Sequence, residues 1–424
     1  MKKGPVPFFI KYLRFNSKRR GNIKIRIIPI VLSLSVLILS VSFGGQKAEW
    51  KGKIEIEDGI KVIKNPAEPL YGEMKLELEE DLSIGNEEDE NYLFYRARDI
   101  QVDTDGNIYV LDSGNHRLQV FDKSGKYLRT IGKSGQGPGE FNAPSSLQLD
   151  DETGNIFVTD NMLRKIIIFE NEGRYIDKDI NLVELLNDFY LDSDKCIWGK
   201  FSLPGIDMYR FIKKLTLTGK VEKIFTEIPY NMKKLMLSKT KVGNTAYVGG
   251  YFFTHGYEYD LFLSQIDNHT FIYGYSKEYE LIAVDITCEI LFLIKKDESP
   301  IKITKSERDR IKDRIKWDIM KQGHLVPDIS LEFPDYKPYF YSIITDDKSR
   351  IYVRKNPVSR ESNTNHEYDE FNKEGRYIYK INLDHYPEVI KDGYIYTRMT
   401  NEETGLEQIK RYRIKNWDQI KVSK

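Results

Sequence analysis

The sequence of 424 residues is poor in cysteine, with only Cys196 and Cys288. Two cysteines are too few for the disulfide frameworks that stabilise small secreted domains. Both are expected in turns between the first and second strands of sequence repeats that are not neighbours. Because a disulfide requires Cα atoms within about 7 Å of each other, the sequence predicts two free thiols.

The sequence also lacks the short motifs of common enzyme classes. It contains no Gly-x-Ser-x-Gly, no His-Glu-x-x-His and no nucleotide-binding fingerprint. The glycine-rich segment 132–140 resembles a phosphate-binding loop, but its residues are not in the required order and no helix is expected after it. These absences favour a protein that is not an enzyme.

Acidic residues are absent from the first 44 positions, which carry nine Lys or Arg. Residues 1–26 are expected to be a basic cytoplasmic region, and residues 27–44 a signal peptide or a single membrane anchor. Both alternatives stay open, because the uncharged run 27–43 is slightly short for a membrane span of about 20 residues. Either alternative places the remainder outside the cytoplasm, secreted, periplasmic or tethered.

The remainder of the chain has no excess of positive charge. It holds 56 basic and 65 acidic residues, a net charge of −9. Nucleic acid is therefore not expected as a partner, because phosphate binding requires a basic face. The membrane is expected to be contacted through the N-terminal segment only.

The most informative feature that is present is a repeated strand and turn pattern. Residues 96–144 contain four short alternating apolar runs separated by turns such as Asp105-Gly-Asn. The segment that starts at Asp103 returns in related form at several later positions: Asp151, Asp192, Asp285, Asp346 and, more loosely, Asp392. Four-stranded units repeated every 40 to 50 residues or so predict an all-β protein, a single β-propeller of antiparallel blades.

The first two units resemble the NHL-repeat family. The resemblance is carried by residues 106–110, by Asn115 to Asp122 and by the connector 132–144, which includes Gly-Pro-Gly-Glu-Phe. It covers about 90 residues and fades to turn positions afterwards. It implies the fold and the location of exported bacterial six-bladed propellers, which are mostly uncharacterised, and little chemistry.

The units in residues 50–424 predict six blades, or seven if 279–304 is a separate, degenerate blade. Residues 245–275 are expected to join 280–294 in one irregular blade. The last unit lacks a fourth strand, and residues 73–84 are expected to supply it and so close the ring. One helical insertion is expected at 304–322, with Thr304 and Glu307 as a capping box. It is interpreted either as a lid over the channel or as a buttress.

Ligands of propellers bind at the mouth of the central channel, so the loops at one face are the expected place for a site. Three histidines fall in such loops and could hold Zn or another divalent cation: His116, His255 and His366. Their recurrence at repeat positions is equally what a structural role predicts, and no cofactor is the favoured expectation.

Four further residues are candidate ligand contacts: Arg117, Arg164, Tyr257 and Arg354. Arg117 and Arg164 could bind an anionic group, although pairing with Asp112 and Asp160 is the favoured alternative. Tyr257 belongs to an aromatic group that could stack on a sugar or a peptide.

The sequence thus predicts an exported or membrane-tethered binding or scaffolding module for a protein, peptide or glycan. The alternative is a metal-assisted lyase or hydrolase with its site at the channel mouth, because related NHL-type propellers include metal-dependent lyases.

Overall fold

The computed structural model describes residues 49–203, 208–230, 233–242, 245–253, 256–321, 331–355 and 366–421. The expected signal peptide or anchor and its basic flank lie outside these residues. None of the helices in the described ranges is long and apolar enough to cross a membrane.

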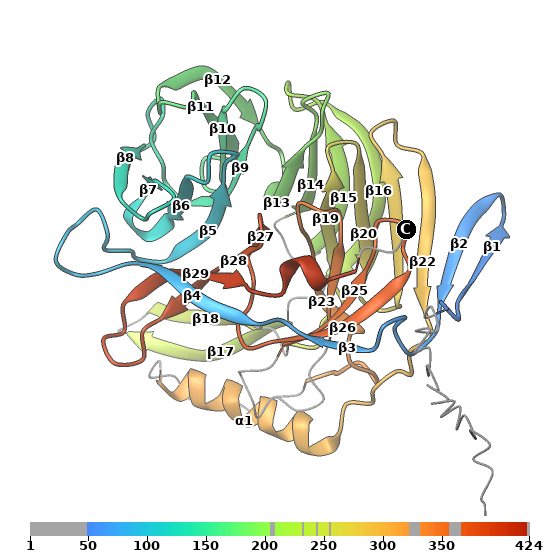
Figure 1. Ribbon diagram of the computed structural model, residues 1–424. Helices are drawn as coiled ribbons and strands as arrows, with labels where there is room; N and C mark the ends of the chain where they lie inside the picture. Colours follow the sequence, from blue (N-terminus) through green and yellow to red (C-terminus); the bar gives the residue numbers. More distant parts are fainter. Residues whose placement is uncertain are drawn as a thin grey trace, which may run out of the picture. The chain divides into compact units, whose positions relative to one another are not determined.

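The chain folds into a six-bladed β-propeller of four-stranded antiparallel blades (Figure 1). Blade 1 comprises β5 (Ala97–Val102), β6 (Ile108–Asp112), β7 (Arg117–Phe121) and β8 (Tyr127–Ile131). Blade 2 comprises β9 (Pro144–Leu149), β10 (Ile156–Asp160), β11 (Lys165–Phe169) and β12 (Tyr175–Asn181). Blade 3 comprises β13 (Leu185–Leu191), β14 (Ile197–Ser202), β15 (Met208–Leu215) and β16 (Val221–Tyr230).

The remaining three blades follow the same order from the channel outward. Blade 4 comprises β19 (Leu261–Asp267), β20 (Thr270–Tyr275), β21 (Glu280–Asp285) and β22 (Ile290–Lys296). Blade 5 comprises β23 (Phe340–Thr345), β24 (Ile351–Lys355), β25 (His366–Phe371) and β26 (Tyr377–Leu383). Blade 6 comprises β27 (Val389–Lys391), β28 (Tyr394–Thr400), β29 (Glu407–Ile414) and the N-terminal strand β4 (Leu78–Ile84).

Apolar side chains between neighbouring blades form the core. Every residue of β6 and β10 is buried, because each of these strands lies inside a sheet that is covered on both faces. Leu111 of blade 1 and Val158 and Ile167 of blade 2 share one cluster. Each blade thus covers an apolar face of the next one, which a single four-stranded sheet could not bury alone.

The N-terminal strand β4 closes the ring. It pairs with β29 over its whole length, from Ile84 opposite Ile409 to Leu78 opposite Ile414, and the two strands lie side by side in Figure 1. The predicted closure is confirmed for residues 78–84. It is wrong for Glu73–Lys75, which form β3 and pair in parallel with β26 of blade 5.

The other N-terminal strands also cover exposed sheet edges. β1 (Lys53–Glu57) and β2 (Ile60–Asn65) form a hairpin, and β2 pairs in parallel with β22 at the outer edge of blade 4. Unpaired edges favour association with other chains, so β2 and β3 protect the edges of blades 4 and 5.

The prediction of six blades is confirmed, but the boundaries of blade 4 were wrong. Residues 261–296 make four regular strands, so 279–304 is not a seventh blade. Thr245–Phe253 forms β18, which among the described strands pairs with β17 (Lys233–Val242) alone, in a separate hairpin. An aromatic strand of that hairpin cannot be told from a blade strand by composition, and this caused the error.

The two cysteines are free, as predicted, although their predicted positions were partly wrong. Cys196 precedes β14 of blade 3, but Cys288 lies between the third and fourth strands of blade 4. These blades are neighbours, and Cys288 packs against the cluster that joins them.

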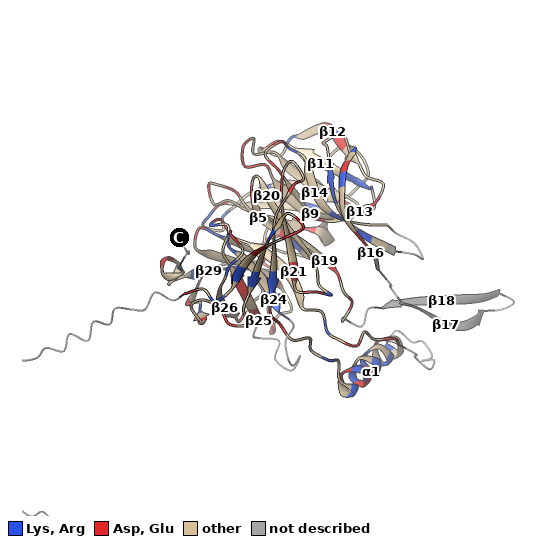
Figure 2. Cartoon of the chain, turned by 90° about the vertical axis from the view of Figure 1, so that its right-hand side faces the viewer, with Lys and Arg blue, Asp and Glu red and all other residues tan. Residues whose placement is uncertain are grey.

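Helix α1 (Lys305–Lys321) confirms the predicted insertion. The hydroxyl of Thr304 accepts from the backbone N–H of Glu307, whose carboxylate accepts from the Thr304 N–H, so the capping box is formed. Charged residues of both signs cover the helix (Figure 2), while Ile311, Ile315 and Ile319 are buried. They pack against Tyr257 and Phe333, and no described residue of α1 lines the central channel. Blade 4 has all four of its strands, so the helix does not replace missing strands as a buttress was expected to do.

Candidate ligand site in the central channel

The central channel forms a cavity of about 1090 Å³. All six blades contribute to its wall through their innermost strands, with Arg98, Ser146, Asp188, Phe262, Ser342 and Val389 as one example from each. This volume is slightly above the range of about 300 to 1,000 Å³ that is usual for ligand pockets in proteins.

The topology of a blade decides which end of the channel carries the charged residues. The innermost strand begins beside the end of the second strand, as Leu185 beside Ser202 and Phe340 beside Lys355 show. Side chains near the start of an innermost strand therefore lie at the same end of the channel as the loops between second and third strands. We call this end the channel mouth.

Ion pairs organise the channel mouth. Nζ of Lys200 lies 2.9 Å from a carboxylate oxygen of Asp188, which is its register partner on the neighbouring strand. The side chain of Asp188 is 57% exposed. Arg398 pairs with Glu388 in blade 6, and Arg210 pairs with Asp260. These pairs hold charged groups of both signs around the cavity.

Arg98 is the exception at the mouth. It lies on β5, is exposed and lines the cavity. Among the described residues no hydrogen bond or ion pair to its guanidinium is found, although its charge lies near Asp188 and lowers the pKa of that carboxyl. Arg98 is therefore available to a ligand.

Asp99, the neighbour of Arg98, has an unusual acidity. Burial raises its pKa to about 7, and the nearby carboxylates of Glu388 and Asp188 act in the same direction. The backbone N–H of Leu147 at 2.7 Å and the hydroxyl of Ser146 at 3.1 Å donate to Asp99 and oppose this rise only partly. The side chain of Asp188 is exposed to the channel but surrounded by protein, which also opposes ionisation; the charge of Lys200 outweighs this effect and lowers the pKa of Asp188. The mouth thus holds one carboxyl that titrates near neutral pH beside one that stays ionised.

Asp99→Asn is expected to stabilise the fold, and the gain should grow with pH. The carboxyl ionises near pH 7 when folded but near about 3.9 when unfolded, so the folded protein retains a proton between these values. The wild type therefore loses stability as the pH rises through this window, and the amide variant does not. Allowing for solvent screening, we expect the free energy of unfolding of Asp99→Asn to exceed that of the wild type by about 1 to 2 kcal/mol at pH 8 and by less at pH 5. Urea denaturation at the two pH values measures this difference.

Asp188→Asn is the matched control. Its lowered pKa means that the ionised carboxylate stabilises the fold above the unfolded pKa, so this variant should lose stability at pH 8. A gain for Asp99→Asn that is the same at both pH values would contradict the assigned acidity.

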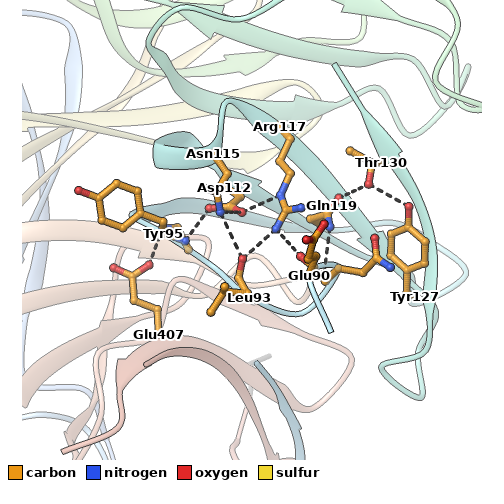
Figure 3. A network of polar contacts seen from close by, with 12 residues as sticks. Glu90, Leu93, Tyr95, Asp112, Asn115, Arg117, Gln119, Tyr127, Thr130 and Glu407 are labelled. Atoms are coloured by element: carbon orange, nitrogen blue, oxygen red, sulfur yellow. Dashed lines mark hydrogen bonds and ion pairs between the residues drawn. The ribbon is translucent and has the colours of Figure 1, made fainter. Parts of the chain in front are cut away.

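The structure places Arg117 in a polar network at blade 1 (Figure 3). Its Nε lies 2.9 Å from a carboxylate oxygen of Asp112, and one terminal nitrogen donates to the carbonyls of Glu90 and Leu93. Its guanidinium thus ties the segment before blade 1 to the blade, as the favoured alternative predicts.

Arg164 and Tyr257 lie elsewhere and do not line the channel cavity. Arg164 donates to the carbonyl of Val183 at 3.4 Å, and the expected pair with Asp160 is not found, since Asp160 accepts from four backbone N–H groups. Tyr257 is 1% exposed and packs beneath α1.

Two of the three candidate metal ligands lie within the described residues, on blades that are not neighbours. His116 lies between β6 and β7 of blade 1, and His366 begins β25 of blade 5, which is not a neighbouring blade. His255 lies outside the described residues. No group of three or more His, Cys, Asp or Glu within the described ranges has a geometry suited to a metal ion.

His366 contacts Arg354 instead. Nδ1 of His366 lies 3.0 Å from a terminal nitrogen of Arg354, and the guanidinium lies over the ring of Tyr386, 5.1 Å from its centroid. Burial lowers the pKa of His366, and the charge of Arg354 adds to this. The imidazole is therefore neutral at pH 7, with Nδ1 accepting from the guanidinium.

Comparison with known protein families places this chain in one of them. Residues 87–356 match the family described as a domain of unknown function, DUF4934. The chain belongs to the DUF4934 family. The match covers the innermost strands of blades 1 to 5, while Glu388 and Arg398 of blade 6 lie outside it. No curated protein matches the sequence of this DUF4934 chain.

Several solved structures resemble the DUF4934 chain. A protein of Bacteroides fragilis that is named as exported shares 14% identity, with a TM-score of 0.49, over 83% of this chain and 100% of its own. A DUF4221 protein of Bacteroides vulgatus has the same identity and TM-score, over 80% and 98% of the two chains. Virginiamycin B lyase of Staphylococcus aureus shares 11% identity, with a TM-score of 0.39, over 80% and 99%. The resemblance to NHL repeats stays a prediction.

Sequence reasoning missed the channel residues of the DUF4934 chain. Arg98 and Asp99 stand near the start of an innermost strand and Asp188 in the middle of another, whereas the site was predicted to lie in loops. A signal was present, because a charged residue at the start of an otherwise apolar innermost strand must face either the channel or the core.

Proposed function

We propose that this protein is an exported binding module that holds a polar ligand, a protein, peptide or glycan, at the channel mouth. The observation that carries the proposal is the convergence of charged side chains from different blades on one cavity, with Arg98 available for a ligand. The basic and apolar N-terminal segment supports export.

The ion pairs around the cavity also support binding. Asp188 is held by Lys200, and Glu388 by Arg398, so their positions are set before a ligand arrives. A site that is already organised loses less conformational entropy on binding. Cations and anions on one rim suit a ligand with several polar groups more than a purely apolar one.

An array of glycans and peptides would first identify the ligands that the wild type binds. Arg98→Ser is expected to lower the affinity for these ligands. A lost charged hydrogen bond costs about 1.5 to 3 kcal/mol, which corresponds to roughly 10-fold to 100-fold in affinity. The affinities of the strongest array ligands should be measured for both proteins by calorimetry.

Arg174→Ser is the control, because Arg174 lies on the outer surface with a side chain 76% exposed and pairs only with Glu170 among the described residues. It should bind like the wild type. Equal binding by Arg98→Ser and the wild type would show that the ligands bind elsewhere and would overturn the proposal.

A lyase or hydrolase acting on the bound ligand is the second candidate. Asp99 favours it, since a carboxyl with a pKa of about 7 is suited to proton transfer near neutral pH. Product formation from an array ligand, lost in Asp99→Asn while binding persists, would support it. A dependence on metal would appear as stoichiometric metal after dialysis, lost when His116, His255 and His366 are replaced together.

A further inference from the structure

Three polar side chains of blade 5 stand side by side across neighbouring strands. Ser342 on β23 is the register partner of Arg354 on β24, and Arg354 is the register partner of Tyr368 on β25. Register partners on adjacent strands project from the same face of a sheet. We call these three residues the blade 5 row.

Each member of the row has a buried polar atom for which no hydrogen bond of good geometry is found among the described residues. These atoms are Oγ of Ser342, Nε of Arg354 and the hydroxyl of Tyr368. Ser342 is 8% exposed and Tyr368 is fully buried. Buried polar groups are almost always paired, and an unpaired one costs about 1 to 3 kcal/mol, so three in one row need an explanation other than packing.

The row is positively charged and is not neutralised by the described residues around it. Arg354 makes no ion pair with a described carboxylate. Its other contacts are the neutral ring of His366 and the face of Tyr386, which orient the guanidinium and leave Nε unpaired.

The row borders the channel cavity through Ser342, while Arg354 and Tyr368 do not line the cavity. Ser342 and Tyr386 both line the channel cavity, into which Arg98 also projects. A group that enters from the channel thus meets Ser342 first and has Arg354 and Tyr368 next to it on the adjoining strands.

We propose that the blade 5 row is an oxyanion subsite, which binds a carboxylate, sulfate or phosphate group of the ligand. The proposal rests on the proposed function and names the chemistry of part of its ligand. An oxyanion accepts hydrogen bonds from N–H and O–H groups, and the row offers one N–H and two O–H donors on a cationic background. A neutral ligand group would leave the charge of Arg354 uncompensated.

The test is a titration of the full chain with sodium sulfate, phosphate and acetate at constant ionic strength, followed by thermal unfolding and calorimetry. At least one anion should raise the melting temperature relative to chloride. The anion with the largest effect identifies whether the ligand group is a sulfate, a phosphate or a carboxylate. No effect of any anion overturns the proposal.

Tyr368→Phe and Ser342→Ala are the decisive variants. Tyr368→Phe removes a hydroxyl for which no hydrogen-bond partner is found among the described residues, so the melting temperature without added anion should not fall, while anion binding should weaken about 10-fold. Ser342→Ala should weaken anion binding to a similar extent, although it also removes the contact of Ser342 with the hydroxyl of Tyr386. Unchanged anion binding in both variants would place the anion elsewhere and overturn the subsite.

Arg98→Ser separates this proposal from the proposed function. Arg98 is not part of the row, so Arg98→Ser should keep the effect of the small anions while it loses the array ligands. If the array ligands depend on Arg98 but not on Tyr368 and Ser342, the channel function stands and the subsite fails. If they do not depend on Arg98 while the anions depend on the row, the proposed function fails and an anion site remains.

Discussion

Ile84→Asp is expected to destabilise the whole propeller by about 3 to 5 kcal/mol, because it places an unpaired charge in the seam that closes the ring. Ile84 is 1% exposed, lies opposite Ile409 and belongs to a cluster that joins blade 6 to blade 1. Neighbouring blades cover each other, so opening one seam exposes apolar faces on both sides. Urea denaturation followed by tryptophan fluorescence measures the loss.

Ser83→Asp is the control on the same strand. Ser83 is exposed and its side chain projects from the opposite face of β4. The same charge there should change the unfolding free energy by less than about 0.5 kcal/mol. Equal effects of the two substitutions would mean that β4 is not part of the core.

Asp369→Ala is expected to lower the free energy of unfolding by about 3 to 5 kcal/mol, because it removes one of the two carboxylates that pair with buried Lys296 and leaves two buried tyrosine hydroxyls without their acceptor. Asp369 is 1% exposed and lies 2.8 Å from Nζ of Lys296, whose side chain is 4% exposed. The hydroxyls of Tyr279 and Tyr377 each donate to Asp369 at 2.5 Å. Burial opposes ionisation of Asp369, but Lys296 and Lys355 outweigh it and lower its pKa.

Glu170→Ala provides the contrast for Asp369→Ala. Glu170 pairs with Arg174 on the surface, where screening by water makes such a pair worth about 0 to 1 kcal/mol. Glu170→Ala should therefore hardly change the free energy of unfolding in the same urea measurement. If Asp369→Ala lowered the free energy of unfolding as little as Glu170→Ala, the charged groups between blades 4 and 5 would have to be hydrated. That result would contradict the buried ion pair of Asp369 and Lys296.

Local patterns in the sequence predicted the parts of the fold that depend on neighbouring residues. The Asp-Gly turn at Gly106 has the positive φ of +85° that glycine tolerates, and Thr304 caps α1 as its spacing with Glu307 predicts. The missing fourth strand of blade 6 predicted closure by the N-terminal segment, since a blade without its outer strand would expose an edge.

Pairings between distant segments were harder to predict. Met74 and Ile84 belong to one continuous apolar pattern, yet they pair with blades 5 and 6 respectively. The strand 245–253 has the composition of a blade strand, and only its partner, 233–242, shows that it is a separate hairpin. Strand partners depend on which edges are free, and local sequence carries little information about that.

The candidate site was the least predictable part. Of the predicted contacts, Arg354 lies beside the channel, while Arg117 ties down the segment before its blade and Tyr257 lies beneath α1. The residues at the channel mouth come from innermost strands of different blades, so their proximity follows from the ring as a whole. A search of single repeats cannot find a site that exists only when the ring is closed.

If the ring is closed by β4, the N-terminal strands are an integral part of the propeller, and cutting the chain after them tests this directly. A protease site placed after Glu88, in the exposed segment between β4 and β5, allows the chain to be cut there after folding. We expect the fragment carrying β1 to β4 to stay bound during gel filtration in native buffer and to separate only in denaturant. A fragment that separates in native buffer, leaving the rest folded, would contradict the closed ring and the channel that depends on it.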